Sequence, residues 1–287
     1  MIISMFPWGG GGSLIPDLPE FTYTGEYEKV ADADGGWRLR LLTSGTLTFT
    51  GQVTADLFAV GGGSGGWAGY YDSDLGEYYG GGGGAGGYTD TELSKTLIAG
   101  HAYTVEIGAG GLAGTESSYP GAGGTTSMDN LITARGGEVR DLTQYQPKYF
   151  CNIGGSGGGS GNQYNFIPSY MTHLSGDGGS NGGDGAGTDY GTGQGTTTRE
   201  FGEANGELYA GGGAGGNTGY TTQYRGGAGG GGDGAYGNYR VGGRASNGYP
   251  NTGGGGGGGA HSTSGPDGTT RLAGNGGSGI LIIRNAR

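Results

Sequence analysis

The sequence predicts an all-β fold in which a β-sandwich-like N-terminal part merges into a glycine-rich bundle with aromatic loops. Two observations lead to this fold class. Several short segments alternate apolar and polar residues with a period of two, which is typical of strands with one buried face. Glycine supplies 81 of the 287 residues, where roughly 7% is usual, and it occurs in blocks between these segments. We expect no significant helix, because no longer stretch shows a 3.6-residue period.

The clearest strands lie between residues 21 and 60. Trp37–Leu41 places its tryptophan and two leucines on one face and its two arginines on the other, and Thr46–Thr50 alternates in the same way. Ala55–Val60 is more continuously apolar, so we expect it to be covered on both faces. The closing segment 279–284 is an apolar strand of the kind that fills a sheet centre. Further strands are expected at 21–24, 27–30, 89–98, 103–107, 125–128 and 131–134.

The glycine blocks require a separate explanation. Collagen needs glycine at every third position with abundant proline, but these blocks are continuous and there are only 8 prolines. Disordered chains are poor in aromatic residues, whereas this chain has 20 tyrosines. Side by side, the blocks could form polyglycine II-type helices that hydrogen-bond to one another, or they could be tightly packed β-edges; both interpretations remain open. The blocks lie at 61–66, 80–87, 108–114, 121–124, 154–161, 176–187, 211–216, 226–234, 253–259 and 274–279.

The domain organisation that we expect has three parts. Residues 1–20 form an N-terminal arm, residues 21–60 a β-strand subdomain, and residues 61–287 a glycine-rich domain closed by strand 279–284. The arm begins with apolar residues, and exposed apolar clusters usually mark contacts. It is either a frayed terminus or an anchor on a neighbouring subunit. The anchoring candidates are Ile2, Ile3, Met5, Phe6 and Trp8.

Composition excludes several partners. The net charge is −11 and Lys and Arg form no block, which argues against nucleic acid and anionic membranes. No segment approaches the ~18 apolar residues of a membrane span. The apolar start is short and the first basic residue is Lys29, so we expect no secretory signal.

Catalytic and metal-binding motifs are also missing from the sequence. No GxxxxGK[ST] motif occurs, the three histidines are far apart, and nothing marks Cys151 as an activated thiolate. Asp72, Asp74 and Glu77 could supply oxygen ligands to Ca²⁺, but a solvated acidic loop is the simpler interpretation. We therefore expect a protein that is not an enzyme and holds no cofactor or metal.

Aromatic loops between the glycine blocks are the strongest indication of function. Tyr and Trp give large, rigid contact area, while Ser, Gly and Asn give adaptable hydrogen bonds. These loops contain that mixture, which suits a protein or a sugar. Alternatively, the tyrosines stack along the bundle as a minimal core. The receptor-binding candidates are Trp67, Tyr70, Tyr71, Tyr78, Tyr79, Tyr145, Tyr149, Tyr164, Tyr170, Tyr190, Tyr220 and Tyr224.

The order of these features resembles the glycine-rich domain of bacteriophage and prophage tail proteins, a group of adhesin-like, polyglycine-rich tail fibre proteins. The most specific element is Ile98–Gly111, a strand followed by a glycine turn. The resemblance covers Val53–Arg284, with a longer insertion at 140–175, and leaves out the arm. Its other elements are Asp56–Gly63, Gly80–Tyr88, Gly123–Ser127, Ile132–Gly137 and Gly276–Arg284.

The resemblance implies a virion protein of a tail fibre or tail tip whose loops bind the host cell surface, through a glycan or a protein receptor. Its other partners would be virion subunits that hold the arm. A homotrimer is expected from fibre symmetry, with a monomeric tip as the alternative. The competing interpretation is a purely structural virion protein, such as a capsid decoration, head fibre or baseplate component, whose loops contact only other virion subunits.

Overall fold

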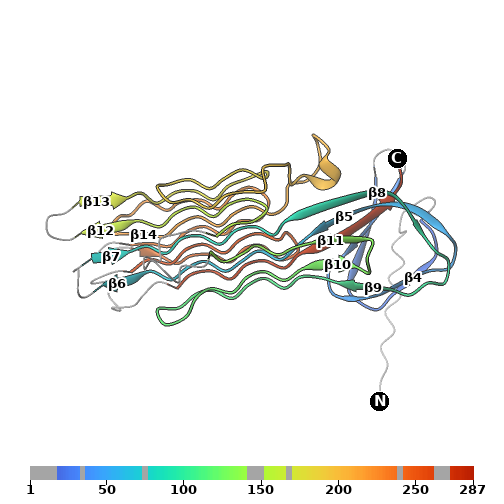
Figure 1. Cartoon of the computed structure of the whole chain (residues 1–287), viewed down its shortest axis with the longest axis horizontal. Coiled ribbons are helices and arrows are strands. Elements are labelled where there is room, and N and C mark those ends of the chain that lie inside the picture. Colours follow the sequence, from blue (N-terminus) through green and yellow to red (C-terminus); the bar gives the residue numbers. More distant parts are fainter. Residues whose placement is uncertain are drawn as a thin grey trace, which may run out of the picture.

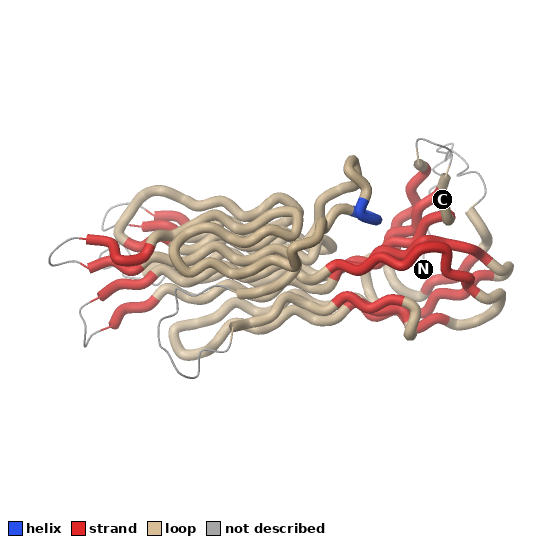
Figure 2. The backbone as a smooth tube through the Cα atoms, turned by 45° about the horizontal axis from the view of Figure 1, so that its top comes forward, coloured by secondary structure: helices blue, strands red, loops and turns tan. Residues whose placement is uncertain are grey.

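The computed structural model is elongated and all-β, as predicted (Figure 1). It describes residues 18–32, 36–72, 77–140, 152–165, 170–237, 242–261 and 272–287. A β-sandwich forms one end, glycine-rich segments run side by side from it, and short hairpins form the opposite end, which we call the distal end (Figures 1 and 2). Within the described ranges, the one helical element is the three-residue 3₁₀ turn η1, Glu200–Gly202.

The first sheet of the sandwich has the closing strand at its centre. The order is β2-β3-β17-β5-β8, and all neighbours are antiparallel. Strand β17 pairs with β3 on one side and β5 on the other, which confirms the position predicted for segment 279–284. The strands are β2 (Tyr27–Ala31), β3 (Trp37–Leu41), β17 (Ile280–Asn285), β5 (Val53–Val60) and β8 (Thr89–Leu97).

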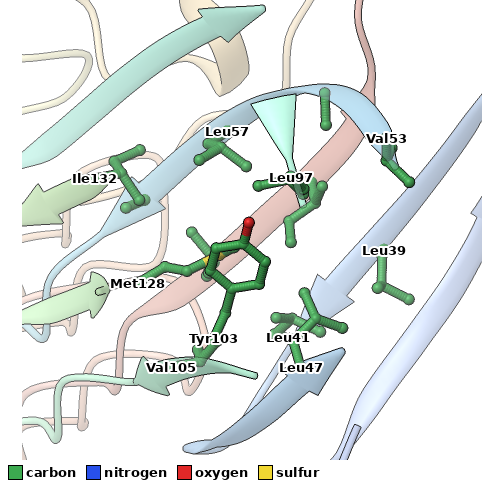
Figure 3. Close-up of a cluster of buried hydrophobic side chains, with 14 of the residues drawn as sticks. Leu39, Leu41, Leu47, Val53, Leu57, Leu97, Tyr103, Val105, Met128 and Ile132 are labelled. Carbon is green, nitrogen blue, oxygen red and sulfur yellow. The ribbon is translucent and has the colours of Figure 1, made fainter. Parts of the chain in front are cut away.

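The second sheet packs face to face on the first and encloses the main core. Its order is β1-β4-β9-β10-β11, again antiparallel. The inward residues Leu39, Leu41, Leu47 and Phe49 are fully buried, as the alternation predicted. Figure 3 shows Leu39, Leu41 and Leu47 in one cluster with residues of β9, β10 and β11. The strands are β1 (Phe21–Tyr23), β4 (Gly45–Phe49), β9 (Tyr103–Glu106), β10 (Thr126–Met128) and β11 (Ile132–Ala134).

A segment far along the chain covers the outer face of β5 and β17. Residues 198–210, which we call the covering segment, bring Phe201 and Tyr209 against Phe58, with ring centroids 5.7 and 5.5 Å apart. Ile282 of β17 is fully buried in the same cluster. The prediction that Ala55–Val60 is covered on both faces is therefore confirmed. It also follows that the boundary expected at residue 60 does not divide the fold in space, because strands from both sides of it share both sheets.

Hydrogen bonds between the glycine segments repeat every third residue. Within segment 61–67, donors return to the same neighbour after three residues, at 2.8–3.0 Å. Gly61, Ser64 and Trp67 donate to segment 82–88, Gly62 and Gly65 to segment 121–124, and Gly63 and Gly66 to segment 274–277. A β-strand would alternate with a period of two between two neighbours, whereas three residues per turn is the period of the polyproline II-type helix. The segments are thus polyglycine II-type helices rather than β-edges.

Segment 253–259 shows how closely these helices pack. It is hydrogen-bonded to six neighbours, namely 61–67, 81–87, 211–214, 232–235, Ser246 and 274–278. The close approach leaves no room for side chains: a Cβ built on Gly213 would lie 2.0 Å from the carbonyl oxygen of Gly256, and one on Gly66 would lie 2.2 Å from that of Gly257. The bundle is therefore held by backbone hydrogen bonds where other folds use apolar side chains.

Small sheets terminate the bundle at the distal end. Strands β6 and β7 form one hairpin and β12 and β13 another, in the order β13-β12-β7-β6. The sequence predicts loops in these regions, so the two hairpins differ from that expectation. Their bounds are Tyr70–Asp72, Glu77–Tyr79, Gln163–Asn165 and Tyr170–His173, and a three-stranded sheet beside them contains β14 (Asn217–Thr218), β15 (Tyr236–Gly237) and β16 (Gly242–Gly243).

Candidate functional site

The β6–β7 hairpin carries two stacked tyrosine pairs at the distal end. Tyr70 lies opposite Tyr79, and Tyr71 lies opposite Tyr78. The ring centroids of each pair are 4.5 Å apart, with interplanar angles of 6° and 25°. Because side chains alternate along a strand, one pair lies on each face of the hairpin. Four of the receptor-binding candidates are thus brought together by register alone.

The first pair consists of the half-buried Tyr70 and the buried Tyr79. Tyr79 is buried, and its hydroxyl donates to Glu77 Oε2 at 2.5 Å. The same oxygen accepts from Gln163 Nε2 at 2.5 Å, and Gln163 Oε1 lies 2.9 Å from His173 Nδ1. His173 Nε2 in turn lies 3.1 Å from Asp189 Oδ2. This chain of polar contacts holds both hairpins and the turn at residue 189 in one arrangement.

The second pair, Tyr71 and Tyr78, faces outward. The Tyr71 side chain is 43% exposed. The imidazole of His261 lies beside both rings, 5.6 Å from Tyr78 and 6.2 Å from Tyr71 between centroids. Partial burial raises the pKa of Tyr78, and the neighbouring Tyr71 hydroxyl adds to that effect. We call Tyr71, Tyr78 and His261 the outer aromatic face.

His261 is positioned by its backbone and has an unusual environment. Its N–H donates to Thr218 Oγ1 at 3.0 Å, and its Nδ1 atom is buried without a hydrogen-bond partner among the described residues. Burial lowers the pKa of His261, while the negative charge of Glu116 acts in the opposite direction. The ring is therefore neutral near pH 7. His261 is not among the site residues predicted from the sequence, because it follows a glycine block and no motif surrounds it.

Trp67 lies in the interior rather than on a loop. It is 1% exposed, and its Nε1–H donates to Asn152 Oδ1 at 3.0 Å. The three-residue repeat explains the position, because Gly61, Ser64 and Trp67 all face segment 82–88. Tyr119 packs edge-on against the indole at 5.2 Å and is itself 61% exposed. Of these two rings, it is Tyr119 that presents surface to a partner.

The family comparison agrees with the extent of this fold. A family model described as a glycine-rich domain matches residues 42–286. The chain belongs to this family. No curated protein matches the chain. The glycine-rich domain thus begins before β4 and ends after β17, so it includes sandwich strands as well as the polyglycine helices.

Other candidates of the glycine-rich domain are spread over further turns. Tyr190 and Tyr220 are 44% and 40% exposed, and Tyr224 is half-buried. Tyr164 and Tyr170 lie on β12 and β13. Tyr145, Tyr149 and the five anchoring candidates Ile2, Ile3, Met5, Phe6 and Trp8 lie outside the described residues.

The described ranges contain neither a cluster of metal-ligating side chains nor a membrane-spanning helix. No group of three or more His, Cys, Asp or Glu side chains there is placed to hold a metal ion. Asp74, one of the three acidic residues considered for Ca²⁺, lies outside those ranges. In the same part of the chain, no helix has the length and apolar character needed to cross a membrane.

Proposed function

We propose that this glycine-rich domain protein is a virion component of a bacteriophage or phage-like particle, at a tail fibre or tail tip, that binds the host cell surface through its distal loops. The observation that carries the proposal is the placement of two tyrosine-bearing hairpins together at the end of the bundle away from the sandwich (Figure 1). The resemblance of Val53–Arg284 to phage tail proteins supports the location in a virion.

The physical basis is preorganisation. A bundle whose backbone groups bond to as many as six neighbouring segments holds its end loops without needing a large apolar core there. A rigid support reduces the ordering cost of binding, and tyrosine supplies contact area at low entropic cost. An exposed tyrosine such as Tyr71 on a fixed hairpin is therefore well suited to recognising a surface.

The rest of the assignment follows from this role. The protein acts as an adhesin without catalysis, cofactor or metal, and neither nucleic acid nor membrane is its partner. Residues 1–20 attach it to other virion proteins, and it works as a homotrimer or as a monomeric tip. It is assembled in the host cytoplasm and becomes extracellular within the particle.

Adsorption of the particle that carries the protein tests the proposal. The variant combines Tyr71→Ser, Tyr190→Ser and Tyr220→Ser, which removes three exposed rings, one of them on strand β6. The control is Tyr249→Ser, because Tyr249 is 65% exposed but lies in the turn that is hydrogen-bonded to Ser278, next to β17. We expect the triple variant to lose adsorption and the control to keep it, with both chains folded.

Unchanged adsorption of the triple variant would contradict the proposal. It would favour the alternative, a purely structural virion protein whose loops contact only other virion subunits. Antibody labelling of intact particles then distinguishes the two roles further, because the proposal expects label at the tail and the alternative allows it on the capsid.

A further inference from the structure

The outer aromatic face has no structural role comparable with that of the inner pair. The hydroxyl of Tyr79 connects to the polar chain that joins the two hairpins. Tyr71 and Tyr78 stack on each other on the opposite face, where Tyr71 is 43% exposed. They lie on a strand pair whose other face already provides the packing. Core packing therefore leaves the outer pair unexplained, and exposed aromatic clusters of this kind usually mark contacts.

The three rings of this face come from separate elements, namely β6, β7 and the residues that follow glycine segment 253–259, and their positions are fixed before any ligand is present. Strand β7 pairs with β6 on one side and with β12 on the other, which fixes Tyr78. The backbone N–H of His261 donates to the Thr218 hydroxyl. The backbone of Thr218 is in turn held by the Asn162 side chain, whose oxygen accepts from the Thr218 N–H at 2.7 Å and whose NH₂ group donates to the Thr218 carbonyl at 2.8 Å. A ligand would meet a surface that is already formed, which keeps the cost of binding low.

The chemistry of the face favours an uncharged ligand with both apolar and hydroxyl groups. A tyrosine ring offers an apolar surface and a polar tip, which matches the C–H face and the rim of hydroxyls of a pyranose ring. The negative charge of Glu116 acts on His261, so it disfavours anions beside this ring. His261 itself is neutral near pH 7, so it supplies no charge for a phosphate, sulfate or carboxylate. The net charge of −11 also disfavours binding of an anionic ligand.

We infer that Tyr71, Tyr78 and His261 form a binding face for a neutral sugar residue of a surface glycan. This inference rests on the proposed function and gives its receptor a chemical class. A protein receptor would require a larger buried interface centred on a well-packed anchor, and the described residues around the outer pair form no apolar cluster of that kind. The sugar would stack on the tyrosines, with its hydroxyls toward the phenol groups.

Binding to an array of neutral and anionic oligosaccharides, followed by titration of the best neutral ligand, tests the inference. The full chain is compared with Tyr71→Ser, Tyr78→Ser, Tyr71→Phe and the control Tyr249→Ser. Because stacking needs the ring, we expect each Ser variant to lose roughly tenfold or more in affinity, a loss on the scale of one aromatic contact. Tyr71→Phe should stay within a few-fold of the parent, as should the control.

A near-ultraviolet circular dichroism spectrum confirms that each variant is folded, and Tyr71→Ser and Tyr78→Ser test the same face independently if one of them is not. Binding only to anionic oligosaccharides, or equal affinity of all folded variants, would overturn the inference.

A cell assay separates this outcome from failure of the proposed function. Host cells are treated with periodate, which cleaves vicinal diols of sugars, or with protease before adsorption is measured. Loss after periodate alone supports the inference. Loss after protease alone overturns it but leaves the proposed function standing. If untreated cells already take up the triple variant as well as the parent, the proposed function itself fails.

Discussion

Arg284 and Asp56 lie directly opposite each other on the paired strands β17 and β5, 228 residues apart in sequence, with Arg284 Nε 3.2 Å from Asp56 Oδ2. Both side chains are almost fully buried, at 5% and 2% exposure. The guanidinium also reaches the covering segment, because its Nη1 is 2.6 Å from Glu203 Oε1 and its carbon is 3.8 Å from the centroid of the Phe201 ring. One arginine thus joins the sheet centre to the segment that covers it.

Replacing Arg284 by Met should lower the free energy of unfolding by about 3–5 kcal/mol, because it leaves the buried Asp56 carboxylate without its partner. The matched control is Arg135→Met, whose pair with Glu138 is exposed and should cost less than about 1 kcal/mol. Urea unfolding gives both values. Adding Asp56→Asn to Arg284→Met should recover part of the loss, and an additive double variant would show that the two groups act independently.

Replacing Gly213 by Ala should disrupt the bundle. The new Cβ would lie 2.0 Å from the Gly256 carbonyl oxygen, which is backbone and cannot move aside without breaking its neighbours' hydrogen bonds. We expect a loss of about 3 kcal/mol or more, at or beyond the upper range for overpacking. Gly51→Ala is the control, since nothing lies within 4 Å of its Cβ, and it should be neutral or stabilise by up to about 1 kcal/mol. Equal thermal midpoints for the two variants would contradict the close packing described above.

Replacing Asn162 by Ala should loosen the distal end without unfolding the sandwich. The substitution leaves the buried N–H and carbonyl of Thr218 without their partners, at a cost of about 1–3 kcal/mol for each unsatisfied group. Hydrogen exchange should accelerate at Thr218 and His261 but not in β5 or β17. Asn247→Ala, which removes one exposed bond to the Asn275 N–H, should change exchange little. Faster exchange throughout the chain would mean that Asn162 supports the whole fold.

The pH dependence of stability should contain a contribution from Glu200. Burial is the main reason that its pKa is raised, against the attraction of Arg38 and Arg40. The folded protein therefore binds a proton at Glu200 more readily than the unfolded chain does. As the pH rises above the ordinary pKa of the group, near 4.5, the contribution of Glu200 to the free energy of unfolding falls. The stability difference between the parent and Glu200→Gln should decline across that range and level off at higher pH. If the stability of the parent relative to Glu200→Gln instead increased with pH, the pKa of Glu200 would have to be lowered in the folded protein, and the prediction would be wrong.

The sandwich could be predicted from sequence because its residues carry side chains whose alternation reports burial. Leu39, Leu41, Leu47 and Phe49 lie inward as their period of two indicates, and the apolar run at Ile280–Ile283 lies at a sheet centre. The order of the strands across the sheet was harder to predict from sequence. Neighbouring strands can be far apart in the chain, as Arg284 of β17 and Asp56 of β5 are.

Glycine itself carried no such information. Which segment lies beside which depends on backbone hydrogen bonds, and the residues of block 253–259 are identical in sequence while their partners differ. Trp67 illustrates the consequence: a position in an apparent loop became interior because it falls on the three-residue repeat with Gly61 and Ser64. The pairing of Tyr71 with Tyr78 was likewise unforeseen, since no turn motif in the sequence announced the hairpin.

The three-residue repeat of the bundle has a consequence for how the gene can change. Adding one codon within a glycine segment would rotate everything beyond it by about a third of a turn, so every donor there would face the wrong neighbour. Adding three codons restores the phase. The distal turns carry no such restriction, because the helices on either side keep their register whatever the length between them. We therefore expect length variation between related genes to be free in the turns and to occur in steps of nine nucleotides within the bundle.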